Sequence, residues 1–261
     1  MIFLDEVAEA EQQKLLGVHS GEIKEGLLFS INTALFRTRE GVSSYLKWYA
    51  QEVNAPSYDV VGTFWASRMG RYVTFIHWCI ARGVKFEHDW DIDISYVNNE
   101  NGKEPSIHYM VGDSMMEVVH DGDKVAQLHD FYQYYLSPMV HEVANACELR
   151  SSMLWGQLVH TIPFFLKQIS GHESDEFAAN LMTDWDHMKN NAPAEVFAER
   201  KNPFPYRSLE IPNPKNKNEP MHTKSSCCLY FKLSGNYCYS CPRMKPAERQ
   251  ERYEKLKLKN K

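Results

Sequence analysis

The sequence predicts an α+β fold with a mostly helical body, a small antiparallel sheet and a cysteine-rich C-terminal segment. Three observations support this prediction. Long stretches repeat apolar residues with the 3.6-residue period of helices, and residues 90–119 change to the two-residue period of strands. Four of the six cysteines lie within residues 227–241.

The spacing of apolar residues predicts seven helices, at 4–16, 38–54, 58–84, 124–149, 150–169, 173–189 and 246–259. Glycine or an Asn-Ala-Pro sequence follows each of the first three, which is typical of helix ends. Pro163 is expected to kink or interrupt the fifth helix. The apolar stretch 27–36 fits either a short helix or a strand.

Strands are predicted between the third and fourth helices. Residues 90–96 alternate strictly between apolar and polar side chains, and 107–111 and 114–119 have the composition of two further strands. Aspartates on one face of the first strand, together with a nearby histidine, could suggest a metal site (His88, Asp89, Asp91 and Asp93). The solvent-exposed face of a half-buried strand explains these residues better.

The chain is long enough to bury a core without disulfides, since it has 261 residues, of which 43% are hydrophobic. Residues 201–220 contain five prolines interspersed with Asn and Lys, a composition typical of an extended connection. We therefore predict a helical body at 1–215, which would bind the substrate, and a separate C-terminal segment at 216–261.

We expect a cytoplasmic protein. Residues 1–6 carry no basic region or sustained apolar run of the kind that begins a secretory signal. The most apolar stretches, 72–81 and 153–166, are shorter than the ~20 residues that a membrane span requires. Cysteines stay reduced in the cytoplasm, so a cluster of them is more often a metal or redox site than a set of disulfides.

Charge is distributed unevenly along the chain. Residues 221–261 hold ten Lys and Arg against three Glu, whereas the whole chain holds 29 against 34 acidic residues. This basic segment surrounds the cysteines and favours an anionic partner, although a solvated charged helix explains it equally well. The helix at 246–259 is a candidate for peripheral contact with the inner face of the cell membrane. No nucleic-acid partner is expected.

The cysteines form the pattern Cys-Cys, nine residues, Cys-x-x-Cys, at Cys227, Cys228, Cys238 and Cys241. A tetrahedral metal bound to sulfur at ~2.3 Å holds its sulfurs ~3.7 Å apart, a spacing that adjacent cysteines can reach. Neighbouring side chains of a straight strand point to opposite faces, so the adjacent pair must lie at a bend. Gly235 and Asn236 would reverse the chain and bring the two halves together.

Three kinds of site fit this pattern. Thiolates select zinc or iron–sulfur clusters. A structural zinc site more usually has two Cys-x-x-Cys pairs, and a redox dithiol would need only Cys238 and Cys241. A [2Fe–2S] cluster would use all four cysteines.

Over residues 225–244 the sequence resembles the FhuF-type ferric-siderophore reductases. The resemblance rests on Cys227-Cys228-Leu-Tyr-Phe-Lys-Leu and on Cys238 and Cys241-Pro242, with a more diffuse similarity around Arg150-Ser-Ser-Met-Leu-Trp155-Gly156. It implies that the four cysteines bind a [2Fe–2S] cluster. The family usually has ten residues between the two pairs; this chain has nine, and the difference falls in the loop tip at 234–236.

The resemblance also implies a reaction, the one-electron reduction of siderophore-bound Fe(III) to the more weakly chelated Fe(II). Because the chain has no glycine-rich dinucleotide fingerprint, a ferredoxin-like or flavoprotein donor is expected to reload the cluster. The ferric siderophore would lie in a cleft between the body and the loop that carries the four cysteines (residues 227–241), here called the cysteine loop. The candidate contacts, for which solvated surface or core is the competing interpretation, are Lys224, Lys232, Arg243, Lys245, Arg150 and Trp155.

Two other functions stay open at this point. A zinc-stabilised binding protein would dock an acidic partner through its basic C-terminus. A chelate-binding protein without redox activity would keep the pocket and lose the cluster. The colour and metal content of the purified protein would separate these functions.

Overall fold

The computed structural model describes residues 14–19, 21, 23, 25–86, 90–99, 104–111, 116–118, 123–216 and 218–259. Its main helices are α3 (Arg39–Glu52), α4 (Tyr58–Ala81), α5 (Lys124–Asp130), α6 (Ser137–Ala146), α7 (Ser151–Ser170), α8 (Asp175–Asn190) and α10 (Pro246–Lys259). The predicted helix at 4–16 lies outside the described residues except for Lys14–Leu16, which are helical and end at Gly17 with φ 70°. The predicted α+β class with a mostly helical body is confirmed.

The principal sheet has four strands, β1 (Val18–His19), β2 (Leu27–Asn32), β4 (Asp93–Val97) and β5 (Ser106–Met110), in the order β1-β5-β4-β2. β2, β4 and β5 are antiparallel neighbours, whereas β1 runs parallel to β5, so the sheet is mixed and not purely antiparallel as predicted. The ambiguous stretch 27–36 becomes β2 followed by a 3-10 helix, η1 (Thr33–Arg37).

The expected strand at 114–119 does not join this sheet. It forms β6 (Met116–Val118), which pairs antiparallel with β3 (Val84–Phe86), the strand that follows α4. A further short pair, β7 (Glu210–Ile211) and β8 (Met221–His222), lies in the proline-rich connection. The partner of a short strand depends on distant parts of the chain, and this is why the local pattern located the strand without identifying its neighbour.

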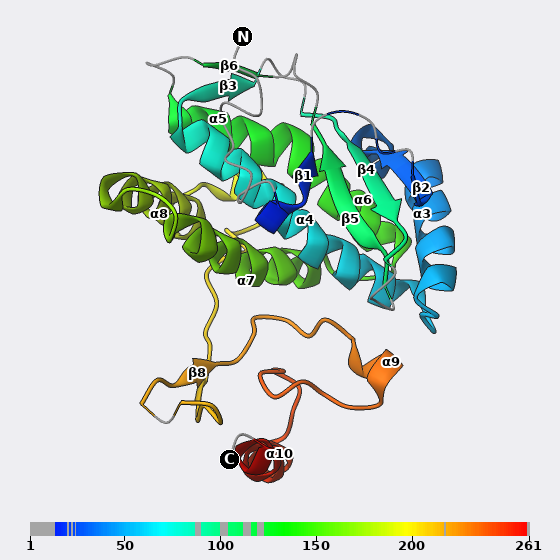
Figure 1. Cartoon of the computed structure of the whole chain (residues 1–261), viewed down its shortest axis with the longest axis vertical. Coiled ribbons are helices and arrows are strands. Elements are labelled where there is room, and N and C mark those ends of the chain that lie inside the picture. The colour runs from blue at the N-terminus through cyan, green and yellow to red at the C-terminus, as the bar shows by residue number, and fades with distance from the viewer. Residues whose placement is uncertain are drawn as a thin grey trace.

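The helices α4 and α7 form the centre of the body and run side by side in the same direction (Figure 1). Ser67 Oγ lies 3.4 Å from Thr161 Oγ1, and one turn later the Arg71 guanidinium lies 5.1 Å from the centre of the Phe165 ring. Gly70 allows this close approach, because a Cβ at that position would lie 2.7 Å from Thr161 Cβ. We call this contact the α4–α7 seam. Neither glycine in α4 nor Pro163 in α7 interrupts its helix.

The predicted helix at 124–149 is continuous but changes its pitch in the middle. Between α5 and α6 lies a π-helical turn, η3 (Phe131–Leu136), which buries Tyr132 and Tyr135. The Tyr132 hydroxyl lies 3.0 Å from His77 Nε2. Burial lowers the pKa of His77 to about 3, so this histidine is a neutral core residue, as expected.

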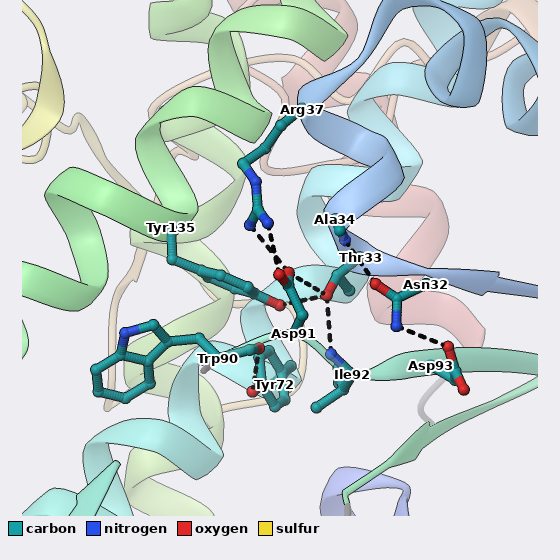
Figure 2. A network of polar contacts seen from close by, with 10 residues as sticks. All are labelled: Asn32, Thr33, Ala34, Arg37, Tyr72, Trp90, Asp91, Ile92, Asp93 and Tyr135. Atoms are coloured by element: carbon teal, nitrogen blue, oxygen red, sulfur yellow. Dashed lines mark hydrogen bonds and ion pairs between the residues drawn. The ribbon is translucent and has the colours of Figure 1, made fainter. Parts of the chain in front are cut away.

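A network of polar contacts joins η1 to the start of β4 (Figure 2). Arg37 donates two hydrogen bonds to the two carboxylate oxygens of Asp91, and the Thr33 hydroxyl lies 3.2 Å from Asp91 Oδ1. Asn32 donates to Asp93 at 2.9 Å. Asp93 is the exposed first residue of β4, as expected, whereas Asp91 precedes the strand and is half-buried in an ion pair with Arg37. His88 and Asp89 lie outside the described residues.

The segment after α8 runs below the helical body in Figure 1 as a largely irregular stretch, coloured yellow to red, and ends in α10. The 3-10 turn η4 (Ala194–Phe197) lies near its start, and the segment also includes a one-turn helix, α9 (Phe231–Ser234). Within residues 221–259, four side chains are buried in the same apolar cluster as the core of the body (Cys227, Leu229, Cys241 and Met244). None of the helices that the structure describes is long and apolar enough to cross a membrane.

Replacement of Asp91 by Asn is expected to lower the free energy of unfolding by about 1–2 kcal/mol, because one half of a bidentate, charge-assisted contact is lost. Asp93→Asn is the matched control. Its side chain is exposed, and an amide oxygen can still accept from Asn32, so a change below about 0.5 kcal/mol is expected. Urea denaturation measures both, and equal losses in the two variants would contradict a special role for the Arg37–Asp91 pair.

Candidate functional site

The segment that leads into the first two cysteines is fixed to α7 by its serines. Ser225 Oγ donates to the carbonyl of Gly156 at 2.6 Å, and Ser226 Oγ donates to the carbonyl of Met153 at 2.9 Å. The Gln157 amide in turn donates to Ser226 Oγ. Gly156 makes room for this approach, since a Cβ at that position would lie 2.6 Å from Ser226 Oγ. The cysteine loop therefore enters the body at one defined turn of α7.

The adjacent cysteines are joined to α4 through Cys228 and are followed directly by a residue in the left-handed conformation. Thr63 Oγ1 on α4 donates to the carbonyl of Cys228 at 2.7 Å. Leu229 has φ 57°, a left-handed conformation that is unfavourable for a branched side chain and turns the backbone sharply. Gly235 ends α9 with φ 73°. The chain therefore changes direction at Leu229, one residue after the predicted bend at the cysteine pair, and Gly235 lies at the predicted loop tip.

The Cys-x-x-Cys half is closed by backbone contacts and by one arginine. The N–H of Cys241 donates to the carbonyl of Cys238 at 2.9 Å, and the N–H of Lys224 donates to Ser240 at 2.9 Å, which joins the two halves of the loop. Arg249 on α10 donates to the carbonyls of Cys241 at 2.7 Å, Tyr239 at 3.2 Å and Met244 at 3.3 Å. The basic helix α10 therefore holds the loop in place through Arg249, in addition to placing positive charge near it.

These contacts bring two of the sulfurs together. Cys241 Sγ lies 3.5 Å from Cys227 Sγ, and both side chains are buried. Cys228 and Cys238 are partly exposed, and all four cysteines are free thiols. The distance between the buried sulfurs is close to the ~3.7 Å expected for two thiolates on one tetrahedral metal atom.

Burial and mutual repulsion disfavour the thiolate form in the absence of a metal. Burial raises the pKa of Cys238; the ammonium of Lys224 opposes this shift, while Cys241 and Cys228 add to it. Burial also raises the pKa of Cys241, with further contributions from Cys227 and Cys228 that the backbone N–H of Arg243 opposes. Each of the four thiols therefore lies close enough to another to repel its charge, and a bound cation would relieve this repulsion and release protons.

The four cysteines could serve two kinds of metal centre, a single metal ion or a [2Fe–2S] cluster, which need different arrangements of ligands. The described residues contain no group of three or more His, Cys, Asp or Glu side chains placed to hold a single metal ion. A [2Fe–2S] cluster makes a different demand, because each iron takes two thiolates and bridging sulfides complete its coordination. Cys227 and Cys241, whose sulfurs lie 3.5 Å apart, could hold one iron, and Cys228 and Cys238 in the same loop would have to hold the other. The residues therefore fit such a cluster without any three sulfurs surrounding one atom.

The residues expected to contact a chelate lie in different environments. Trp155 is fully buried and packs against Phe197 and Phe204, so it belongs to the core and lines no cleft. Lys232 forms an ion pair with Asp59 at 2.5 Å on the outside of α4. Lys224 lies beside Cys238 and His160. Burial raises the pKa of Cys238, which the charge of Lys224 opposes, and burial lowers the pKa of His160, to which the charge of Lys224 adds. The remaining three are exposed (Arg150, Arg243 and Lys245).

Several residues that hold the loop were not singled out from the sequence. Thr63 and Gln157 lie in apolar helical patterns, where a polar side chain gives no sign of its partner. Arg249 is one of ten basic residues in the last 41, and nothing in the local pattern distinguishes it. The pair Ser225-Ser226 next to the cysteines is the one signal that could have been used, since serines beside a metal-binding motif often anchor its backbone.

No family model matches the chain, and no curated protein is significantly similar to it. The interpretation of the site therefore depends on the cysteine motif, on the placement of its sulfurs and on the contacts that hold the loop.

Gly156→Ala is expected to destabilise the protein by about 1–3 kcal/mol and to expose Cys227, because the added methyl displaces Ser226 from α7. Chemical denaturation and the rate of iodoacetamide labelling of Cys227 measure the two effects. Gly171→Ala, at the end of the same helix, is the control; its Cβ would meet only one backbone oxygen at 3.4 Å. If Cys227 in Gly156→Ala were labelled no faster than in the parent, the docking contact would not protect it.

The Asp59–Lys232 pair predicts a pH-dependent contribution to stability. Burial acts to raise the pKa of Asp59, but hydrogen bonds from Lys232 and Ser57 outweigh it and hold the pKa below 3.8. The unfolded chain therefore binds more protons in this range, and the contribution of the pair falls as the pH drops below about 3.8 through the folded pKa. Above that pH we expect Asp59→Asn to cost about 1 kcal/mol.

The measurement is the difference in unfolding free energy between the parent and Asp59→Asn from pH 7 to pH 3. Glu254→Gln serves as the control, because Glu254 pairs with Lys257 on the surface of α10 at 3.8 Å. A difference for Asp59→Asn that persists undiminished at pH 3 would show that the carboxylate charge is not its source.

Proposed function

We propose that the protein is a ferric-siderophore reductase that transfers one electron to chelated Fe(III) through a [2Fe–2S] cluster held by Cys227, Cys228, Cys238 and Cys241. The observation that carries this proposal is the approach of Cys227 and Cys241 to 3.5 Å within a loop that also contains the other two thiols. A bound cluster would accept an electron from a donor and supply it to Fe(III), which leaves the chelator more readily as Fe(II).

The protein's own residues have three tasks in this proposal. Ser225 and Ser226 fix the loop to α7, and Arg249 orders the backbone of the Cys-x-x-Cys half. Lys224 places a positive charge beside Cys238, which offsets part of the negative charge of a thiolate-bound cluster. The burial of Cys227 and Cys241 restricts water on one side, whereas the partial exposure of Cys228 and Cys238 leaves the other side accessible. No side chain is required as a general acid or base.

The charge distribution supports a protein electron donor. The C-terminal residues 221–261 are basic in a chain with a net charge of −5, so an acidic ferredoxin-like protein or flavoprotein would be attracted to the end that carries the cysteines. We place the reaction in the cytoplasm, where released Fe(II) stays reduced, with α10 as the candidate for peripheral contact with the membrane.

A zinc-stabilised binding protein is the alternative, since a sulfur–sulfur distance of 3.5 Å also suits two ligands of one zinc ion. In that case the basic C-terminus would dock an acidic partner and no electron would be transferred. The two functions differ in a property that is visible on purification, because zinc is colourless and redox-inactive.

Purified without oxygen, the parent protein is expected to be reddish-brown, to contain two irons and two acid-labile sulfides per chain by the composition of the cluster, and to give a paramagnetic resonance signal when reduced. Cys238→Ser should lose the colour and ferric-chelate reduction together. Cys147→Ser is the matched control, since Cys147 is buried against Gly62 and outside the loop.

A colourless parent with one tightly bound zinc ion would overturn the reductase proposal in favour of the alternative. A Cys238→Ser variant without the cluster that reduced ferric chelates at the parent rate would show that electrons take another path.

A further inference from the structure

A pocket of about 760 Å³ opens between the β1–β5 edge of the sheet and the helices α4 and α7. Its volume lies within the range of roughly 300–1,000 Å³ that is typical of small-molecule sites. Residues from four distant parts of the chain form its walls, among them His19, Arg71, His108 and Thr161. The function proposed above uses none of them.

The described lining of this pocket is mainly cationic. It contains Lys14, Arg68 and Arg71 against the single carboxylate of Glu104. Arg68 is paired with Glu104 and lies over the Phe64 ring at 5.0 Å. Arg71 has an aromatic neighbour, and no ion pair joins it to a carboxylate among the described residues. In a chain with a net charge of −5, such a lining selects an anionic ligand.

Neutral hydrogen-bonding groups complete the lining. The hydroxyls of Ser67 and Thr161 face each other across the α4–α7 seam. His19 Nε2 and His108 Nδ1 are 2.7 Å apart, so one ring donates to the other. Burial lowers the pKa of both histidines, which favours this neutral pair. The lining therefore offers donors and acceptors suited to a ligand rich in oxygen atoms.

The pocket and the cysteine loop share the same seam. Residues four apart on a helix lie one above the other on the same face. Two such rows meet along the seam: Thr63, Ser67 and Arg71 on α4, and Gln157, Thr161 and Phe165 on α7. At the first level, Thr63 and Gln157 hold Cys228 and Ser226; at the second and third levels the side chains line the pocket. Along α4 these levels are separated by about 6 Å each, from a rise of ~1.5 Å per residue.

An aromatic contact provides a second connection. Phe64 on α4 stacks against Tyr230, two residues after Cys228, with ring centres 6.2 Å apart. Phe64 also carries the guanidinium of Arg68, which lines the pocket, 5.0 Å from the centre of its ring. A ligand in the pocket would therefore be separated from the cysteine loop by one or two turns of packed side chains.

We propose that this pocket is the chelate site, that it takes anionic ferric chelates with oxygen donors, and that Arg71 is the residue that recognises their charge. The inference rests on the proposed function for the identity of its ligand. It assigns the substrate to the α4–α7 seam and not to the exposed basic residues of the C-terminal segment.

The test uses gallium(III) complexes, because gallium has the charge and size of Fe(III) and is not reduced. Binding of a trianionic hexadentate tris-catecholate complex to the full-length protein is measured by calorimetry, beside an uncharged tris-hydroxamate complex. Arg71→Glu is expected to weaken binding of the anionic complex by about tenfold or more, since a cation at the site is replaced by an anion. The uncharged complex should bind more weakly to the parent and respond less to the substitution.

Two further variants make the result decisive. Arg71→Met removes the guanidinium that lies over Phe165 and keeps a long, unbranched side chain, so it decides the question if Arg71→Glu does not fold; a severalfold loss is expected. Lys47→Glu makes the same change of charge on the exposed surface of α3 and should bind as the parent does.

Parent-like binding of the anionic complex by the Arg71 variants would overturn the pocket assignment, and equal binding of the two complexes would overturn the preference for anions. Because gallium binding does not require electron transfer, either result is distinct from failure of the reductase proposal, which the colour and iron content of the parent decide.

Discussion

The close packing of α4 against α7 is the constraint on which the other parts of this structure depend. Two helices can approach closely along several turns only where small residues face large ones. Gly70 faces Thr161, and at the next level Gly156 accepts the incoming Ser226. The sheet packs against the helices at one end of this contact and the cysteine loop docks at the other. A change in the spacing of the two helices would therefore displace both the sheet and the cysteine loop.

The loop has little regular structure of its own, so its shape has to be imposed from outside. α9 is one turn long; Thr63 of α4 and Arg249 of α10 donate to backbone carbonyls of the loop, and the Gly156 carbonyl of α7 accepts from the Ser225 side chain. Four thiols that repel one another as thiolates are thus held together by contacts made elsewhere. This division between a rigid support and reactive groups is common in metal centres, where the supporting contacts orient the ligands.

The helices and the cysteine motif were predictable because both are local patterns. The 3.6-residue spacing located α3, α4, α7, α8 and α10, and the cysteines that the structure gathers are those that their spacing indicated. What the sequence did not reveal depends on distant pairing. The parallel alignment of β1 with β5 joins residues about ninety positions apart, and β6 leaves the sheet to pair with β3. Trp155 was a candidate to line a cleft, but Phe197 and Phe204, which follow α8 in the chain, pack against it and bury it in the core.

The π-helical turn between α5 and α6 has a consequence for the phase of the long helix around it. Its apolar residues Phe131 and Leu136 are five positions apart, a spacing that an α-helix would place on diverging faces and that a π turn brings into line. The wide turn therefore resets the rotation of the helix, so that Val140 and Val143 of α6 still point into the core. Removal of a single residue from this turn would rotate α6 by about 100° relative to α5. The orientation of α6 therefore depends on the number of residues in the π turn.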